Sequence, residues 1–252
     1  MFHRLTSLPP RNSYFLFGAR GTGKTTLLAS LHPRDATLSI DLLDAQEEDL
    51  FARNPVELER RVAALPGSVR HVVLDEIQRV PRLLDVVHRL IETTDLQYVM
   101  TGSSGRKLRR GASNLLAGRA FVHNLSPLTH RELGNAFDLV AALRWGTLPK
   151  LFQYDADSER NDYLRAYALT YVQEEIRAEQ IVRRLDPFRQ FLEVAAQSSS
   201  RIVNYSKIAD DVGVDTKTVQ SYFSILEDTL LGSLLPSYHG SVRKRQRANP
   251  KF

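Results

Sequence analysis

Cysteine is absent from the 252 residues of this chain. Its absence excludes disulfide bonds, thiolate metal sites and cysteine nucleophiles, and it favours a reducing compartment. The first twelve residues lack the apolar stretch of a secretory signal peptide, and no apolar run approaches the roughly 20 residues of a membrane-spanning helix. Internal repeats and low-complexity segments are also missing. We therefore expect a cytoplasmic protein.

The composition is otherwise ordinary for a globular protein, with 42% hydrophobic and 25% charged residues. Lysine and arginine number 34 against 29 acidic residues, which leaves a net charge of +5. The sequence pI is about 9.5. A pI this high permits a nucleic-acid partner but does not require one. The length predicts one or two domains.

Short apolar runs alternate with helix-like stretches over the first 127 residues. Strands are predicted at 14–17, 37–42, 71–74, 97–100 and 120–125, and helices at 24–31, 55–65, 82–92 and 108–117. This alternation indicates an α/β fold with a parallel sheet covered by helices on both faces. After Pro127 the apolar spacing becomes helical, with two long helices predicted at 163–181 and 188–197.

The strongest motif is a phosphate-binding loop between the first strand and the first helix. Its residues fit the pattern G-x-x-x-x-G-K-[ST], in which glycines let backbone N–H groups turn toward a phosphate. We expect Lys24 to reach the β- and γ-phosphates, Thr25 to ligate Mg²⁺, and the helix N-terminus to attract the phosphates. The predicted nucleotide-binding residues here are Gly18, Ala19, Arg20, Gly21, Thr22, Gly23, Lys24, Thr25 and Thr26.

Two acidic residues follow the third predicted strand. In P-loop enzymes an acid at this point completes the Mg²⁺ shell, which fits Asp75. The neighbouring Glu76 is the candidate to orient the attacking water or accept its proton. An Asn-Lys-x-Asp element that would read guanine is not present, so the predicted nucleotide is ATP.

Polar and basic residues follow the fourth strand. Thr101 and Ser103 are candidates to contact the γ-phosphate, although a plain polar turn is an equal alternative. Several arginines come next, and one of them is a candidate to stabilise charge on the transferred phosphoryl group, often from a neighbouring subunit. Arg119 is favoured by its position directly before the fifth strand.

These segments together resemble the bacterial and archaeal AAA-type ATPases that carry a nuclease-like C-terminal domain of unknown function. The resembling stretches are 15–28, 74–92 (with DEIQRVPRLLDVVHRLIE), 100–121 and 127–133. Residues 146–149 are similar to the Gly-x-Leu-Pro element in the lid of related signal-transducing ATPases. Members of this family usually continue into a further domain, so we expect either a truncated chain or a naturally shortened gene product.

The resemblance implies an AAA-like core with a helical lid. It implies Walker A at 18–25 and Walker B at 74–76, it places Ser103 at the first sensor, and it places Arg119 at the arginine finger. Pro149 would lie against the adenine, with a simple helix stop as the alternative. The predicted domains are the P-loop core at 1–127, the lid and connecting helices at 128–185, a winged helix at 186–240 and a basic tail at 241–252.

The winged-helix prediction is based on residues 205–238. A helix at 205–212, a turn containing Gly213 and a second helix at 216–228 follow the helix-turn-helix pattern, and 230–238 is typical of a wing strand. The second helix of such a motif enters the major groove of DNA. The candidate DNA contacts are Thr216, Lys217, Gln220 and Ser221, with phosphate contacts from Arg243, Lys244, Arg245 and Arg247.

The same module also serves as a protein-packing domain in ATPases of this type, and three nearby aspartates would repel DNA. The leading hypothesis is therefore an ATP-driven, Mg²⁺-dependent switch or motor whose partner is double-stranded DNA or another protein. The alternative is a nucleotide-gated binding module with negligible hydrolysis. A small-molecule kinase is a weaker third hypothesis, because no acceptor-binding element is visible. A trans-acting Arg119 would require a homo-oligomer.

Overall fold

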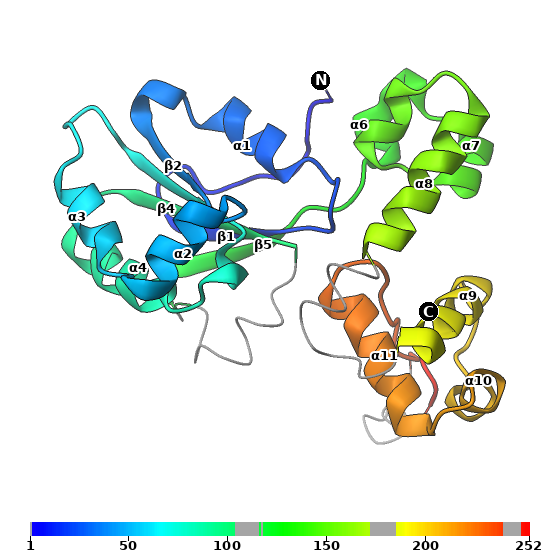
Figure 1. The fold of residues 1–252 in the computed structure, drawn as a ribbon. Coiled ribbons are helices and arrows are strands. Elements are labelled where there is room, and N and C mark those ends of the chain that lie inside the picture. The colour runs from blue at the N-terminus through cyan, green and yellow to red at the C-terminus, as the bar shows by residue number, and fades with distance from the viewer. Residues whose placement is uncertain (1, 104–115, 117, 172–184, 239–247) are drawn as a thin grey trace. The chain divides into compact units, whose positions relative to one another are not determined.

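The computed structural model describes residues 2–103, 116, 118–171, 185–238 and 248–252 (Figure 1). The chain divides into two compact units, Met1–Leu164 (unit 1) and Arg165–Phe252 (unit 2). The division between the two units falls within the helix Asp157–Tyr171. The finer sequence-based boundaries at 127, 185 and 240 stay predictions.

Unit 1 is built on a five-stranded sheet in which every pairing is parallel. The strand order is β2-β3-β4-β1-β5. The strands are β1 (Ser13–Phe17), β2 (Thr37–Asp41), β3 (His71–Asp75), β4 (Gln97–Gly102) and β5 (Ala120–Asn124). The predicted α/β class and all five predicted strands are confirmed.

Between β1 and β4, helices connect the strands and cover the sheet. The helices of this part are α1 (Lys24–Leu31), α2 (Ala45–Arg53), α3 (Glu57–Ala63) and α4 (Leu83–Thr93). Figure 1 shows α1 on one face and α2 to α4 on the other, as right-handed crossovers require when the chain reverses direction along the sheet. The sequence did not predict α2, which buries only Phe51. The predicted helix at 108–117 lies outside the described residues, apart from Leu116.

Strand β1 lies inside the sheet, between β4 and β5, and all five of its residues are buried. Tyr14 and Leu16 pack with Leu28 of α1 in one apolar cluster. A continuous apolar run is what a strand covered on both faces needs. The strand order changes direction along the sheet at β1. The loop after β1 lies at the carboxyl edge of this point, which is where open α/β sheets bind ligands.

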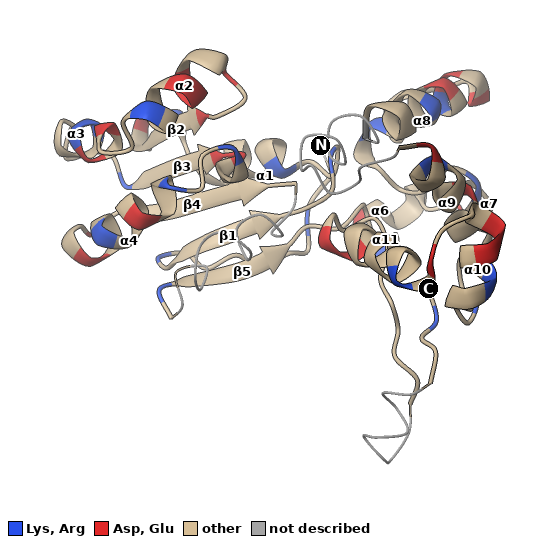
Figure 2. Ribbon diagram, turned by 60° about the horizontal axis from the view of Figure 1, so that its bottom comes forward, with Lys and Arg blue, Asp and Glu red and all other residues tan. Residues whose placement is uncertain are grey.

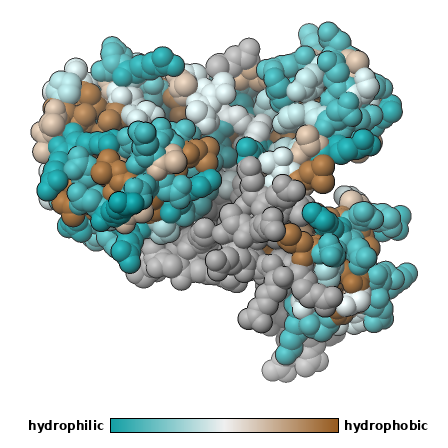
Figure 3. Space-filling view, viewed as in Figure 1, coloured by the Kyte–Doolittle hydropathy of each residue, from teal (hydrophilic) through white to brown (hydrophobic). Residues whose placement is uncertain are grey.

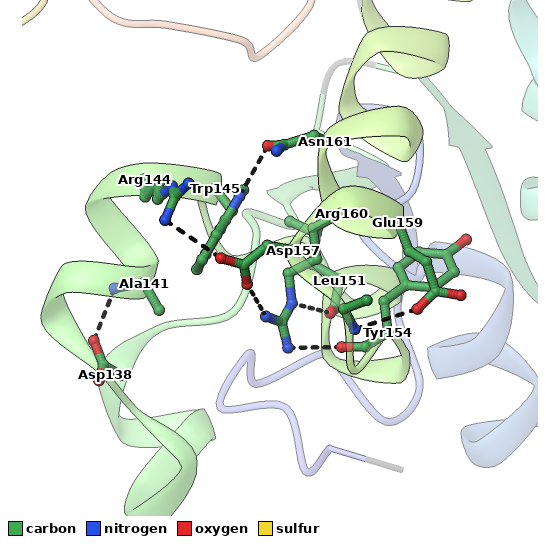
Figure 4. Close-up of polar contacts among 11 residues, drawn as sticks. Asp138, Ala141, Arg144, Trp145, Leu151, Tyr154, Asp157, Glu159, Arg160 and Asn161 are labelled. Atoms are coloured by element: carbon green, nitrogen blue, oxygen red, sulfur yellow. Dashed lines mark hydrogen bonds and ion pairs between the residues drawn. The ribbon is translucent and has the colours of Figure 1, made fainter.

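A helical segment follows β5 and contains α6 (His130–Leu133), α7 (Leu139–Trp145) and the start of α8 (Asp157–Tyr171). The Trp145 ring lies near the guanidinium groups of Arg144 and Arg160, at 4.5 and 5.1 Å (Figure 4). Asp157 accepts hydrogen bonds from both arginines. Arg160 also donates to the backbone of Leu151, so this network fixes the turn that begins at Pro149.

Unit 2 contains α9 (Leu185–Gln197), α10 (Tyr205–Val212) and α11 (Thr216–Asp228) around an aromatic core. Gly213 has a φ of 70° and ends α10, so the predicted helix, turn and helix are present. Within the predicted wing at 230–238, Leu235 forms an antiparallel bridge with Lys251. The Phe252 ring packs against Phe223, with centroids 5.0 Å apart, so the last residues belong to this core.

Hydrophobic residues are interspersed with hydrophilic ones on the face of the molecule drawn in Figure 3. Among the helices of the described ranges, none combines the length and the apolar character that crossing a membrane requires.

A histidine cluster lies among β1, β3, β4 and the end of α1. His32 is 8% exposed, and its Nε2 lies 2.9 Å from the hydroxyl of Tyr14. Its ring centroid is 4.5 Å from that of His71, which in turn contacts Gln97 through Nδ1. Burial and the neighbouring His71 lower the pKa of His32 to about 4. Burial also raises the pKa of Tyr14.

The His32 cluster predicts a loss of stability in mild acid. Between pH 6.5 and 4 the unfolded chain binds a proton at His32 that the folded chain does not, so the free energy of unfolding falls by about 3 kcal/mol as pH drops. A His32→Gln variant should lose this component of the pH dependence, as measured by urea unfolding at several pH values. The exposed His3→Gln variant is the control, and identical curves for all three proteins would contradict the prediction.

Candidate active site

The phosphate-binding loop joins β1 to α1 and needs glycine for two different reasons. Gly21 and Gly23 have φ values of 78° and 91°, in the left-handed region that other residues rarely adopt. At Gly18 the backbone is crowded instead, because an added Cβ would lie 2.6 Å from the carbonyl oxygen of Leu125. The three glycines therefore set the backbone conformation of the loop.

Lys24 and Thr22 are turned into this loop. The ammonium of Lys24 donates to the Gly18 carbonyl at 2.7 Å, and the Thr22 hydroxyl donates to the Ala19 carbonyl at 2.8 Å. Both residues are buried. Because α1 begins at Lys24, its unpaired N–H groups and its positive dipole end face the loop.

Thr25 and Asp75 meet at the carboxyl edge of the sheet. The Thr25 hydroxyl donates to the Asp75 carboxylate at 3.0 Å. Thr101 on β4 donates to the other oxygen of the same carboxylate, so Asp75 is oriented from two sides. A hydroxyl and a carboxylate fit Mg²⁺, which binds oxygen ligands and completes its shell with phosphates and water. The described residues contain no group of three or more His, Cys, Asp or Glu side chains that would hold a metal by themselves.

Glu76 directly follows Asp75 and has a φ of 57°, which is unusual for a residue other than glycine. Its carboxylate accepts a hydrogen bond from the side-chain amide of Gln78. The same amide nitrogen donates to the Ser103 hydroxyl at 3.3 Å. The predicted base and the predicted γ-phosphate sensor are therefore connected by a residue that sequence analysis did not select, because a lone glutamine carries no motif.

Arg4 is a second residue that the sequence analysis missed. It donates through Nε to Glu132 of α6 at 2.9 Å and through Nη1 to the Thr22 carbonyl of the loop at 2.8 Å. The two charged side chains are 8% and 3% exposed. Burial alone raises the pKa of Glu132, but hydrogen bonds from the backbone of Thr129 and Leu5 and from Arg4 lower it overall. This buried ion pair joins residues 128 positions apart, which sequence spacing does not reveal.

Removing the Arg4 side chain should therefore lower the stability of the fold. Arg4→Ala leaves Glu132 buried without its cation, and we expect the free energy of unfolding to fall by about 3 kcal/mol. Arg89→Ala, which breaks an exposed pair with Glu59, is the control and should cost less than about 1 kcal/mol. Urea unfolding measures both values. Equal losses in the two variants would contradict the role given to Arg4.

Pro149 begins a 3₁₀ turn (Pro149–Gln153) beside the phosphate-binding loop. Its Cγ lies 3.9 Å from the position that a Cβ on Gly23 would occupy. Arg20 of the loop is close enough to Tyr163 of α8 to act on the pKa of that phenol, which burial raises. Residues of the helical segment thus approach the loop, and the adenine contact of Pro149 stays a prediction.

Arg119 does not lie at this edge of the sheet. Arg119 precedes β5 at the opposite end of the strand from the loop, and it forms an exposed ion pair with Glu92 of α4 at 2.5 Å. This arginine holds the pKa of Glu92 below its usual range through its hydrogen bond and its charge. Thr216, Lys217, Gln220 and Ser221 lie on α11 of unit 2. The basic residues Arg243, Lys244, Arg245 and Arg247 lie outside the described residues.

Comparisons with known proteins divide the chain into two halves. Residues 10–134 match the family model of an AAA domain, and residues 136–252 match a family described as Domain of unknown function (DUF8612). An uncharacterized protein of Mycobacterium tuberculosis is 27% identical over 94% of this chain and 52% of its own length. One of Methanocaldococcus jannaschii is 29% identical over 46% of this chain and 26% of its own. The chain thus spans about half the length of the mycobacterial relative.

Solved structures resemble the chain more distantly. The ORC2 protein of Aeropyrum pernix, in its ADPNP–ADP complexes, has a TM-score of 0.49 and 14% identity over 90% of this chain and 82% of that one. Domain III of the Thermotoga maritima replication initiation protein DnaA has a TM-score of 0.34 and 15% identity over 89% and 87%. Likenesses at these values do not identify a function.

Proposed function

We propose that this protein binds Mg²⁺–ATP, hydrolyses it and converts turnover into a conformational change, as the match of residues 10–134 to the family model of an AAA domain supports. One observation carries the proposal. At the carboxyl edge of one sheet, the Thr25 hydroxyl contacts the Asp75 carboxylate, the Lys24 ammonium is turned into the phosphate-binding loop, and Glu76 directly follows Asp75. This is the set of groups that phosphoryl transfer needs.

Each group has a distinct role in the proposed reaction. The loop amides and Lys24 hold the phosphates, and Thr25 with Asp75 would hold Mg²⁺, which neutralises charge on the phosphate oxygens when it is bound. Glu76 orients the attacking water and accepts its proton. Ser103 donates its hydroxyl hydrogen to the γ-phosphate.

The conformational change is proposed to pass through the helical segment that follows β5. Arg4 contacts both the loop, at Thr22, and α6, at Glu132. The turn at Pro149 is held by the Arg160 network and lies beside Gly23. Movement of the loop on ATP binding or phosphate release would therefore displace α6 and the turn at Pro149. These two elements act as the lid.

Arg119 is proposed to act on the site of a neighbouring copy of this chain. Its position at the far end of β5 keeps it from its own phosphate-binding loop. Its ion pair with Glu92 is exposed and therefore worth little, so another anion can replace Glu92. A guanidinium supplied from a partner is a recurring device in phosphoryl transfer.

Unit 2 is proposed to bind the partner of the switch through α11, as a winged helix. Its exposed face carries Lys217, Gln220 and Ser221. Between Leu185 and Tyr238, however, seven acidic side chains, among them Asp210 and Asp211 of α10, outnumber four basic ones. Figure 2 shows acidic and basic residues along the helices of this unit. This charge balance favours a protein partner for the described surface, and a duplex-DNA titration at low and moderate salt distinguishes the two, since DNA affinity falls steeply with salt.

The experiment that tests the proposal is steady-state ATP turnover per protomer over a range of protein concentrations. Turnover above a Glu76→Gln blank supports hydrolysis. A rise in turnover per protomer with concentration supports a site completed between copies, and Arg119→Ala should then remove the rise. Turnover equal to the blank at every concentration would instead favour the nucleotide-gated binding module.

A further inference from the structure

We propose that Gln78 is a positioning residue that couples the γ-phosphate contact at Ser103 to the orientation of the Glu76 carboxylate. The inference rests on the proposed ATP hydrolysis and identifies how the base of that reaction is held. It starts from one contact set: a single amide nitrogen donates both to the Glu76 carboxylate and to the Ser103 hydroxyl oxygen.

The chemistry of a primary amide suits this bridge. The nitrogen of Gln78 carries two hydrogens, so it can serve both acceptors at once. The amide oxygen cannot take its place, because it would face the negative charge of Glu76. Two residues after Glu76, the 3₁₀ turn Ile77–Arg79 brings the glutamine back toward the carboxylate, and the buried Ile77 anchors that turn.

The oxygen side of the Gln78 amide packs closely against the backbone of β4. The Gln78 oxygen is buried and, among the described residues, has no hydrogen-bond partner. It lies against Gly102 at the end of β4, where an added methyl group would collide with it. Gly102 therefore leaves the space that the amide occupies.

This arrangement gives Ser103 a route to the base. A serine hydroxyl can donate its hydrogen to a phosphate oxygen while its own oxygen accepts a hydrogen bond from Gln78. When the γ-phosphate holds Ser103, the hydroxyl oxygen holds the amide, and the amide holds the carboxylate. A diphosphate lacks the group that holds Ser103, so Gln78 and Glu76 are held more firmly when a triphosphate is bound.

The test is a double-mutant cycle on kcat. Gln78→Met keeps the length of the side chain but removes the donor, and Gly102→Ala keeps the donor but displaces the amide. Each single change should lower kcat for ATP by about 10- to 100-fold, as small misplacements of catalytic groups do, with the Kd for Mg²⁺–ATP unchanged. The Gly102→Ala change should then have no further effect in the Gln78→Met background.

Gly67→Ala is the matched control, because no atom lies within 4 Å of a Cβ built at Gly67. Thermal unfolding establishes that each variant is folded. If the losses in kcat from the two single changes multiply in the double variant, the role of Gln78 is overturned. A rise in Kd for Mg²⁺–ATP as large as the loss in kcat would also overturn it. If the wild-type protein hydrolyses ATP and both single variants hydrolyse it at the same rate, this inference fails and the proposed function stands. Absence of turnover in the wild type would overturn the proposed function and this inference with it.

Discussion

Replacing Glu76 with glutamine is expected to lower ATP turnover by about 10²- to 10⁴-fold, the usual contribution of a general base. The amide has almost the same shape as the carboxylate and can still contact Gln78, but it cannot accept the proton of the attacking water. Phosphate-release kinetics measure the loss. Mg²⁺–ATP affinity, measured by calorimetry, should stay within about 2-fold of wild type, because Lys24, Thr25 and Asp75 are unchanged.

The control for this variant is Glu59→Gln, which changes an exposed carboxylate on α3 that pairs with Arg89. It should hydrolyse ATP at the wild-type rate. Full turnover in the Glu76→Gln protein would remove Glu76 from the mechanism. The search for the base would then return to the other acidic residues near the loop.

Replacing Lys24 with methionine is expected to weaken Mg²⁺–ATP binding by about 10- to 100-fold, the value of a charge-assisted hydrogen bond. The effect should appear in Kd as well as in turnover, which separates it from the Glu76→Gln result. Lys24 is 7% exposed, and methionine fills a similar volume without burying a charge. The variant should therefore be at least as resistant to unfolding as the wild type.

Lys207→Met is the matched control, because it removes an exposed lysine on α10 in unit 2. Equal nucleotide affinity in the wild-type and Lys24→Met proteins would show that the ammonium does not contact the phosphates. Binding would then depend on the loop amides and the helix dipole alone.

The sheet and the loop were predictable because their signals are local. Five apolar runs separated by helical spacing predict five parallel strands, and the positive φ values of Gly21 and Gly23 explain why a phosphate-binding loop needs glycine there. The short helix α2 was missed because a single buried residue, Phe51, leaves too weak an apolar pattern. Arg119 was selected by its position, but its place at the far end of β5 depends on the direction of that strand in the sheet.

The sequence by itself determined the parallel α/β class, the loop at 18–25 and the acidic pair that follows β3. Only the tertiary structure decided which side chains hold these groups in place. Gln78 bridges Glu76 and Ser103 because β3 and β4 lie side by side, and Arg4 reaches Glu132 because the N-terminal segment passes between the loop and α6. Gln78 and Ser103 are 25 positions apart, and Arg4 and Glu132 are 128 positions apart. Neither separation corresponds to a helix or strand period, so these pairs meet only in the folded protein.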